Sequence, residues 1–333
     1  MTRFDHRALK DDARKTLSSA RYDPKRLITI HAGTHCLVTA AVALVVFFLN
    51  GQIAETGGLG GLGQRSLLTT IRTVLQLAQM IFLPFWSIGY VSASIDLARD
   101  HSPEPDMLLD GFRKWGVCLR LMLLHILVFG GVLFFSTQAA SFLFCMTPWA
   151  APLVEFVQKY GAVTQIPDIE VIEETFYAVA EQIQVPLMSM ASVVFLIAAL
   201  PFAYRFRLSQ LQLMDDPGAG ALRALFGSGK LMKGSYGAMI RLDLHFWWYH
   251  LGYLLIYLLG NIGPICSLLG IRLSFVSDLF ILCTTLISAA ALFLLCWWKK
   301  NEVSVAYVNA YDILQEPPRE EPRPIPGFQP WNY

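Results

Sequence analysis

The sequence predicts an all-α polytopic membrane protein with six transmembrane helices, cytoplasmic amphipathic helices, and both termini in the cytoplasm. Three observations predict this fold. The 333 residues are 55% hydrophobic and 15% charged, with a mean hydropathy of +0.48, which is too apolar for an ordinary soluble domain. Several stretches reach the roughly 20 apolar residues that a helix needs to cross a bilayer. Finally, Lys and Arg lie almost entirely on one side of these stretches.

The predicted spans divide the chain into a membrane domain with polar ends. The fifth is the least well defined at its start, because Arg241 and Asp243 stand directly before it. An even number of spans agrees with both termini lying on one side. The six are Leu27–Leu49, Leu67–Ile95, Gly116–Ser136, Val185–Tyr204, Leu244–Leu259 and Phe275–Trp298.

The distribution of Lys and Arg sets the orientation. Of the 26 basic residues, 21 fall in segments that share one side, and only Arg65, Lys159 and Arg272 fall in the opposite loops. Because retained positive charge marks the cytoplasmic side, we expect a multi-pass protein of the cytoplasmic (inner) membrane. The basic segments are Met1–Arg26, Leu97–Trp115, Arg205–Arg241 and Lys299–Tyr333.

Three regions follow from these boundaries. Residues 1–26 form a cytoplasmic amphipathic N-terminal segment, and residues 27–300 form the six-span membrane domain. Within that domain, residues 138–184 are an outer segment with six acidic residues, and helical spacing there predicts an amphipathic helix lying on the membrane or capping the bundle. Residues 301–333 are expected to be a cytoplasmic Pro-rich tail.

Amphipathic segments precede each span that runs outward, and they carry much of the cytoplasmic charge. Each has apolar residues at helical spacing among Lys, Arg and Asp. Basic helices of this kind favour anionic lipids of the inner leaflet, at about 1 kcal/mol for each cation near the surface. The apolar positions are Leu9, Ala13 and Leu17; Leu108, Phe112 and Trp115; and Leu222, Leu225, Phe226 and Gly229.

Short motifs on the cytoplasmic side carry a family resemblance. Asp216-Pro217 with Lys230–Gly234, and Leu200-Pro201 followed by Tyr204-Arg205, resemble an uncharacterised bacterial integral membrane family, domain-of-unknown-function family 975. Gly111–Lys114 also fits its pattern. This chain departs from the family where Gln138–Gln184 replaces a brief connection, and where Phe202 follows Pro201 in place of Gly. The family has no established activity, so the resemblance implies topology and no chemistry.

Polar residues within the second span are the first candidates for a substrate pathway. Arg72, Gln76 and Gln79 share one face of its outer half, and Asp278 near the start of the sixth span is a candidate partner for Arg72. An ionisable residue at membrane depth indicates function, because leaving it unpaired is costly. The alternative is that Arg72 snorkels to the headgroups while the glutamines join helices.

Arg120 and His125 on the third span complete the candidate pathway, although they are five residues apart and do not quite share a face. Arg120 lies only four residues after Gly116, so snorkelling toward the cytoplasm is the simpler interpretation for it.

His31 and His35 share a face of the first span, where two imidazoles could bind a metal or relay protons. A metal would need two further ligands that no pattern supplies, so no cofactor is expected. Cys145 and Cys266 both fall on the outer side, and whether they pair stays open.

Three functional hypotheses follow. The first is a non-enzymatic scaffold, regulator or lipid-interacting protein, with anionic lipids and an unidentified protein as partners and no nucleic acid. The alternative is a transporter or permease for a small polar or lipidic substrate. An intramembrane enzyme is the third; no catalytic motif supports it.

Overall fold

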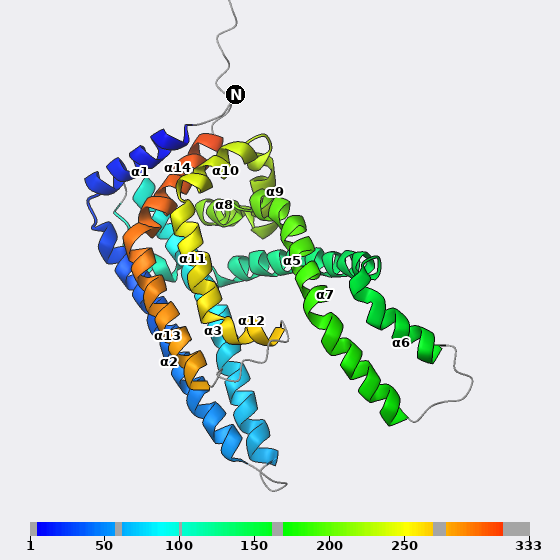
Figure 1. Ribbon diagram of the computed structural model, residues 1–333. Coiled ribbons are helices and arrows are strands. Elements are labelled where there is room, and N and C mark those ends of the chain that lie inside the picture. Colours follow the sequence, from blue (N-terminus) through cyan, green and yellow to red (C-terminus); the bar gives the residue numbers. More distant parts are fainter. Residues whose placement is uncertain (1–4, 57–61, 100–101, 162–168, 269–277, 316–333) are drawn as a thin grey trace, which may run out of the picture.

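The computed structural model describes residues 5–56, 62–99, 102–161, 169–268 and 278–315, and within these ranges every regular element is a helix (Figure 1). The α-helices are α1 His6–Ser19, α2 Pro24–Glu55, α3 Leu62–Ala98, α4 Asp110–Arg113, α5 Trp115–Cys145, α6 Ala151–Gly161, α7 Ile169–Arg205, α8 Ser209–Asp215, α9 Ala221–Met232, α10 Tyr236–His245, α11 Trp247–Gly260, α12 Ile262–Leu268, α13 Asp278–Leu295 and α14 Asn301–Gln315. Short 3₁₀ turns lie at Pro105–Leu109, Pro148–Ala150 and Pro217–Ala219, and a π-helical turn occupies Cys296–Lys300.

Five helices are long and apolar enough to cross a membrane, namely α2, α3, α5, α7 and α13 with its continuation into α14. The predicted fifth span corresponds to α11, which is not among them. With 14 residues, α11 is about 21 Å long, short of the roughly 30 Å hydrocarbon core. The helix is interrupted at Phe246. Arg241 and Asp243 therefore belong to the separate helix α10.

Helices α2, α3, α11 and α13 form the four-helix bundle, in which α13 packs on both α2 and α11 and α2 packs on α3 (Figure 1). Large apolar side chains cover its outside: Leu37, Val74 and Leu294 are 70%, 57% and 62% exposed. Apolar surface of this extent is typical of a face that contacts lipid or a partner.

Helices α5, α6 and α7 form a second group that projects away from the bundle (Figure 1). Within it, α7 runs without a break from Ile169 to Arg205 and tolerates Pro186 and Pro201. The helix predicted within residues 138–184 is therefore continuous with the fourth predicted span, and its place on the membrane or over the bundle stays a prediction. Its apolar spacing belongs to the first half of α7, and the early part of the segment to the end of α5 and to α6, whereas residues 162–168 lie outside the described ranges.

Helices α1, α8, α9, α10 and α14 form a compact cap at one end of the bundle (Figure 1). Its centre is α14, where Ala306, Ala310 and Tyr311 are fully buried. The expected Pro-rich tail at 301–333 is thus wrong for its first part, and residues 316–333 lie outside the described ranges. Positions 303, 306, 307, 310, 311 and 314 carry Val, Ala, Tyr, Ala, Tyr and Leu at helical spacing.

The amphipathic segments supply much of the core of the cap. Asp5 caps α1 by accepting a hydrogen bond from the Arg7 amide at 2.9 Å, and Leu9 and Ala13 of that helix are buried against the cap. Leu108 and Leu225 are buried as well. Trp115, Leu222 and Phe226 are the exceptions, because their side chains remain more than half exposed.

Two glycines allow the backbone of α3 to approach the segment before α5. A Cβ atom added at Gly89 would lie 2.0 Å from the carbonyl oxygen of Leu108, and one at Gly111 would lie 2.0 Å from that of Phe85. Backbone atoms cannot move aside as flexible side chains do, so neither position admits a larger residue without separating the two segments.

We expect Gly89→Ala to lower the free energy of unfolding by about 1–3 kcal/mol, the usual effect of overpacking. Gly130→Ala is the matched control, since its added Cβ would meet nothing within 4 Å and α5 would keep its contacts. Thermal unfolding of the detergent-solubilised protein, followed by tryptophan fluorescence, measures the difference. Equal melting temperatures for the two variants would contradict the close approach.

Candidate functional site

A half-open cavity with polar residues in its lining lies between the helices of the four-helix bundle. It consists of two adjoining hollows of about 290 and 340 Å³. Both are bounded by α2, α3 and α13, and both reach Gly260 and Asn261 at the end of α11. The residues common to the two are Thr39, Gln79, Gly260, Asn261 and Thr285.

Polar side chains from three long helices face this cavity. Gln76 and Gln79 come from α3, Asn50 from α2 and Asp278 from the start of α13. Gln79 Nε2 donates to Thr39 Oγ1 at 3.4 Å, which joins α3 to α2 across the cavity. The arrangement places amides, hydroxyls and one carboxyl group where the outer faces of the same helices are apolar.

Arg72 lies at the edge of this cavity and bonds to one of its lining residues. Its Nη1 donates to Asn50 Oδ1 at 3.0 Å, while its buried Nε finds no partner among the described residues. Within those residues Arg72 forms no ion pair with Asp278, the partner expected from the sequence. Arg72, Gln76, Gln79 and Asp278 are nevertheless brought to one place.

Arg120 and His125 lie elsewhere, because α5 leaves the bundle. His125 Nδ1 is 2.9 Å from the Leu121 carbonyl oxygen, and its Nε2 is 3.2 Å from Ser209 Oγ in α8. Arg120 lines an apolar groove beside α9. The structure therefore separates these two residues from the cavity.

The two histidines of α2 have different surroundings. His35 lines the larger of the two hollows, that of about 340 Å³. His31, one turn nearer the cap, is buried, stacks on Trp86, and its Nε2 lies 2.7 Å from Lys300 Nζ. No group of three His, Cys, Asp or Glu residues in the described part of the chain is placed to hold a metal ion.

The π-helical turn lies between α13, which lines the cavity, and α14 of the cap. It places Lys300 over the ring of Tyr90, 4.6 Å from the ring centroid, as well as beside His31. The next residue, Asn301, accepts a hydrogen bond from the Tyr90 hydroxyl at 2.7 Å and donates to the Pro24 carbonyl at 2.7 Å. These contacts join α2, α3 and α14 around Lys300 and Asn301, where the bundle meets the cap. A π-helical turn of this kind is often found at functional sites.

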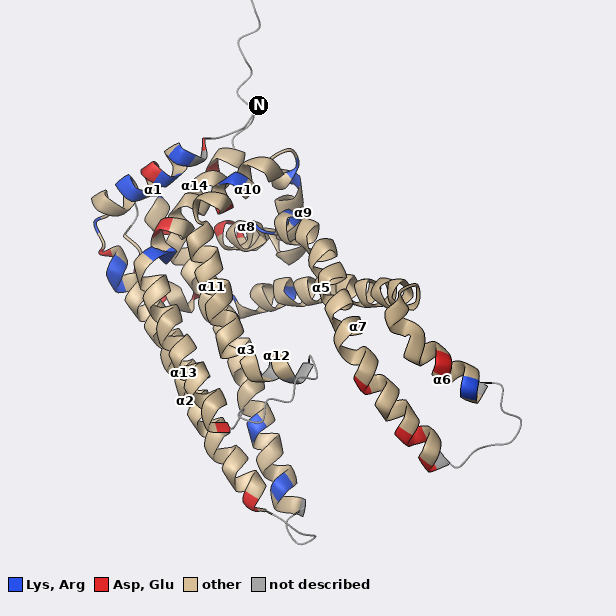
Figure 2. Cartoon of the chain, in the orientation of Figure 1, with Lys and Arg blue, Asp and Glu red and all other residues tan. Residues whose placement is uncertain are grey.

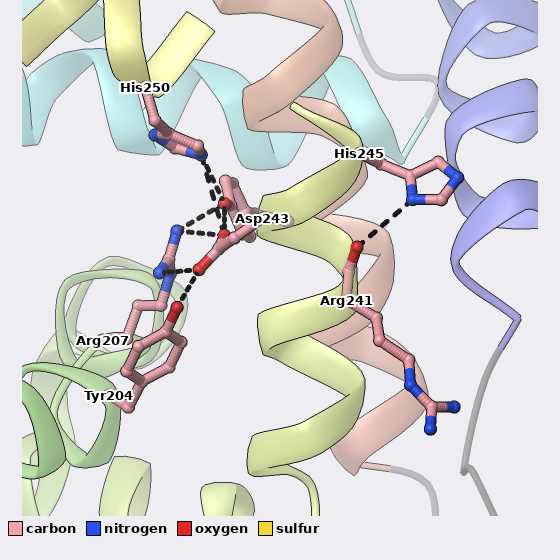
Figure 3. A network of polar contacts seen from close by, with 7 residues as sticks. Tyr204, Arg207, Arg241, Asp243, His245 and His250 are labelled. Atoms are coloured by element: carbon pink, nitrogen blue, oxygen red, sulfur yellow. Dashed lines mark hydrogen bonds and ion pairs between the residues drawn. The ribbon is translucent and has the colours of Figure 1, made fainter. Parts of the chain in front are cut away.

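A network of hydrogen bonds around Asp243 holds the cap to the spans (Figure 3). Arg207 approaches the carboxylate with both terminal nitrogens, at 2.5 and 2.6 Å, and the Tyr204 hydroxyl donates at 2.6 Å. Tyr307 of α14 also donates to it. His250 points into the same cluster, 3.7 Å from the carboxylate. In Figure 3 Arg241 and His245 lie on the other side of α10, away from the network.

A second ion-pair cluster ties the end of α3 to the cap. Arg99 donates to Asp215 at 2.5 Å and to Asp312 at 2.8 Å, and the Tyr311 hydroxyl donates to Asp215 at 3.1 Å. The hydrogen bonds to Asp312 and Asp215 raise the pKa of the Arg99 guanidinium above its usual value. Figure 2 shows how the charged residues gather in the cap, while the far ends of α6 and α7 carry mostly acidic ones.

Sequence reasoning missed both clusters. Their ion pairs join residues far apart in the sequence, Arg207 and Asp243 at 36 positions and Arg99 and Asp312 at 213, so no local spacing marks them. The one sequence feature that could have pointed to these clusters is a charged residue next to an apolar stretch, as at Arg207 and Asp243. Cys145 and Cys266, whose pairing the sequence left open, are both free.

No protein-family model matches this chain, and searches of curated proteins and of solved structures find no significant similarity. The resemblance to family 975 stays a prediction.

We expect Asp243→Asn to destabilise the protein by about 2 kcal/mol or more, because it leaves the Arg207 charge partly buried without its partner. The loss should stay below the roughly 3–5 kcal/mol of a fully buried pair, since 26% of the Arg207 side chain is exposed. Asp106→Asn removes the half-exposed carboxylate that pairs with Arg113 and should change little. Thermal unfolding compares the two; an equal effect would show that the network contributes no special stability.

Proposed function

We propose that this chain is a non-enzymatic multi-pass protein of the cytoplasmic membrane, and that its four-helix bundle is a permease for a small polar substrate. The observation that carries the proposal is the polar cavity inside helices whose outer faces are apolar. In a bilayer, polar and ionisable side chains are costly and mark substrate or ion pathways. Gln76, Gln79 and Asp278 are the residues we expect to contact the substrate.

The size and chemistry of the cavity support a small solute. The two hollows, of about 290 and 340 Å³, adjoin one another and together fall within the usual range of ligand pockets, roughly 300–1,000 Å³. Amide and hydroxyl groups replace the hydrogen bonds that a polar solute loses with water. The carboxyl group of Asp278 adds a preference for a solute that donates hydrogen bonds or carries positive charge.

The packing of the chain ends supports the orientation with both termini cytoplasmic. α1 and α14 pack against each other in the cap, so the two ends of the described chain lie on one side. This arrangement requires an even number of crossings, and α11 is the helix that we propose as the sixth. Under the positive-inside rule, the basic residues of the cap support a cytoplasmic location for it.

Contacts next to the cavity suggest an alternating mechanism. His31 bonds to Lys300 and stacks on Trp86, and Lys300 lies over Tyr90; we propose that these contacts close the cavity toward the cap. In the proposed orientation this is the cytoplasmic end. Release of a substrate to the cytoplasm then requires a second state in which the π-helical turn moves away from α2 and breaks the contact between Lys300 and His31.

A scaffold or lipid-interacting role is the second candidate function. The observation that favours it is the exposure of Trp115, Leu222 and Phe226 at the edge of the cap, where they could contact lipid or a protein partner. The burial of Leu9, Ala13, Leu108 and Leu225 weighs against it, because those apolar positions contact protein and not lipid. The permease is therefore the function that we propose first.

Cysteine labelling tests whether the cavity holds water. In a background without the six native cysteines, we expect Gln76→Cys to react with a small membrane-impermeant cationic thiosulfonate at least tenfold faster than Leu77→Cys. The reactive thiolate forms in water and hardly at all in lipid. Leu77 is the matched control, because it is the neighbouring residue and its side chain is 52% exposed on the apolar surface. Equal rates would show that the cavity is dry.

Flux measurements test the permease itself. We expect proteoliposomes to take up at least one member of a panel of small neutral and cationic solutes faster than protein-free vesicles do. Thr39→Trp fills the space shared by both hollows and should reduce this uptake at least tenfold. Leu37→Trp, on the 70% exposed lipid-facing side of α2, should leave it unchanged. Uptake no faster than in protein-free vesicles would overturn the proposal.

A further inference from the structure

A second cavity system lies far from the bundle, on the surface of the α5–α7 pair. Two adjoining hollows of about 510 and 590 Å³ meet at Leu127 and form one groove. The first is bounded by α5 and the start of α9, and the second by α5 and α7. Arg120 and Ser136 carry the only polar side chains among the lining residues, and none of those residues is acidic.

Arg120 stands at the end of this groove next to the cap. Its side chain is exposed, and within the described residues it has neither an ion pair nor a side-chain hydrogen bond. Asp216, just before the lining segment Ala219–Leu222, accepts the amide of Ala219 through Oδ1 at 3.2 Å and forms no ion pair with Arg120. A cation without a partner at the mouth of an apolar groove favours a ligand with an anionic head and an apolar tail.

The length of the groove fits such a tail. Arg120 and Ala139, the first and last lining residues on α5, are 19 positions apart, which is about 28 Å at 1.5 Å per residue. One leaflet of the hydrocarbon core is about 15 Å thick, half of the roughly 30 Å total. An acyl chain of one leaflet can therefore lie along the groove with its headgroup at Arg120.

We infer that this groove binds one anionic phospholipid molecule, with the phosphate at Arg120 and an acyl chain between α5 and α7. In the orientation proposed above, the headgroup belongs to the inner leaflet, where anionic lipids attract cations. The site uses other helices than the bundle cavity, so it stands whether or not the bundle is a permease. A free anion would gain nothing from the apolar part of the groove, and for that reason the lipid is the occupant.

Two adjacent glycines of α5 provide a matched test. Gly131 lines the groove and Gly130 does not, yet a Cβ added at either would meet nothing within 4 Å. Gly131→Leu therefore fills the groove without a clash, and Gly130→Leu adds the same side chain elsewhere. For the headgroup, Arg120→Gln removes the charge at the groove, and Arg241→Gln removes an exposed charge on α10.

The experiment is native mass spectrometry of the delipidated full-length protein, titrated with phosphatidylglycerol or with phosphatidylcholine of the same acyl chains. We expect the first lipid adduct to form at lower concentration with phosphatidylglycerol. Arg120→Gln should weaken that adduct about fivefold, the equivalent of about 1 kcal/mol for one cation near an anionic headgroup. Gly131→Leu should weaken it at least as much, while Gly130→Leu and Arg241→Gln should not.

Three outcomes would overturn the inference. The first is equal binding of the two lipids. The second is an adduct unaffected by both Arg120→Gln and Gly131→Leu, since it would place the lipid elsewhere. The third is a homodimer or a bound protein that disappears on Gly131→Leu while lipid binding persists, which would assign the groove to a protein helix. Thermal unfolding of each variant confirms that all are folded before titration.

Discussion

The contact between the π-helical turn and the first two long helices is the constraint on which the rest of the structure depends. At this level Lys300 meets His31, and Asn301 joins Tyr90 to Pro24. Below it, α13 lines the polar cavity; above it, α14 is the centre of the cap. Because α13, the turn and α14 form one continuous helix, a shift at this level moves the cavity wall and the cap core together.

The two halves of the molecule bury side chains in opposite ways. The cap follows the rule of soluble proteins, with Tyr311 and Met239 inside and its charges outside or paired. The bundle exposes its apolar side chains, while Gln76, Gln79 and Asp278 line its cavity. The α5–α7 pair has no comparable polar interior, so its groove suits an acyl chain.

Local patterns predicted a large part of this structure. Within the described residues the predicted apolar stretches are helical, apart from a break at Phe246 in the fifth, and Gln76, Gln79 and Asp278 line one cavity. The prediction failed for α14, because the prolines that follow it suggested an extended tail for the whole region. It failed also for Arg120 and His125, because nothing in the sequence of α5 shows that this helix leaves the bundle.

The sequence by itself determined the helical class, the charge asymmetry and the polar positions inside apolar helices. These properties depend on the helical period and on the cost of burying polar groups, which act within one segment. Only the tertiary structure decided which helices pack together, that Arg207 would meet Asp243, and that Lys300 would contact His31. Such contacts join residues up to 269 positions apart, and their geometry depends on the packing of the whole chain, which no local pattern encodes.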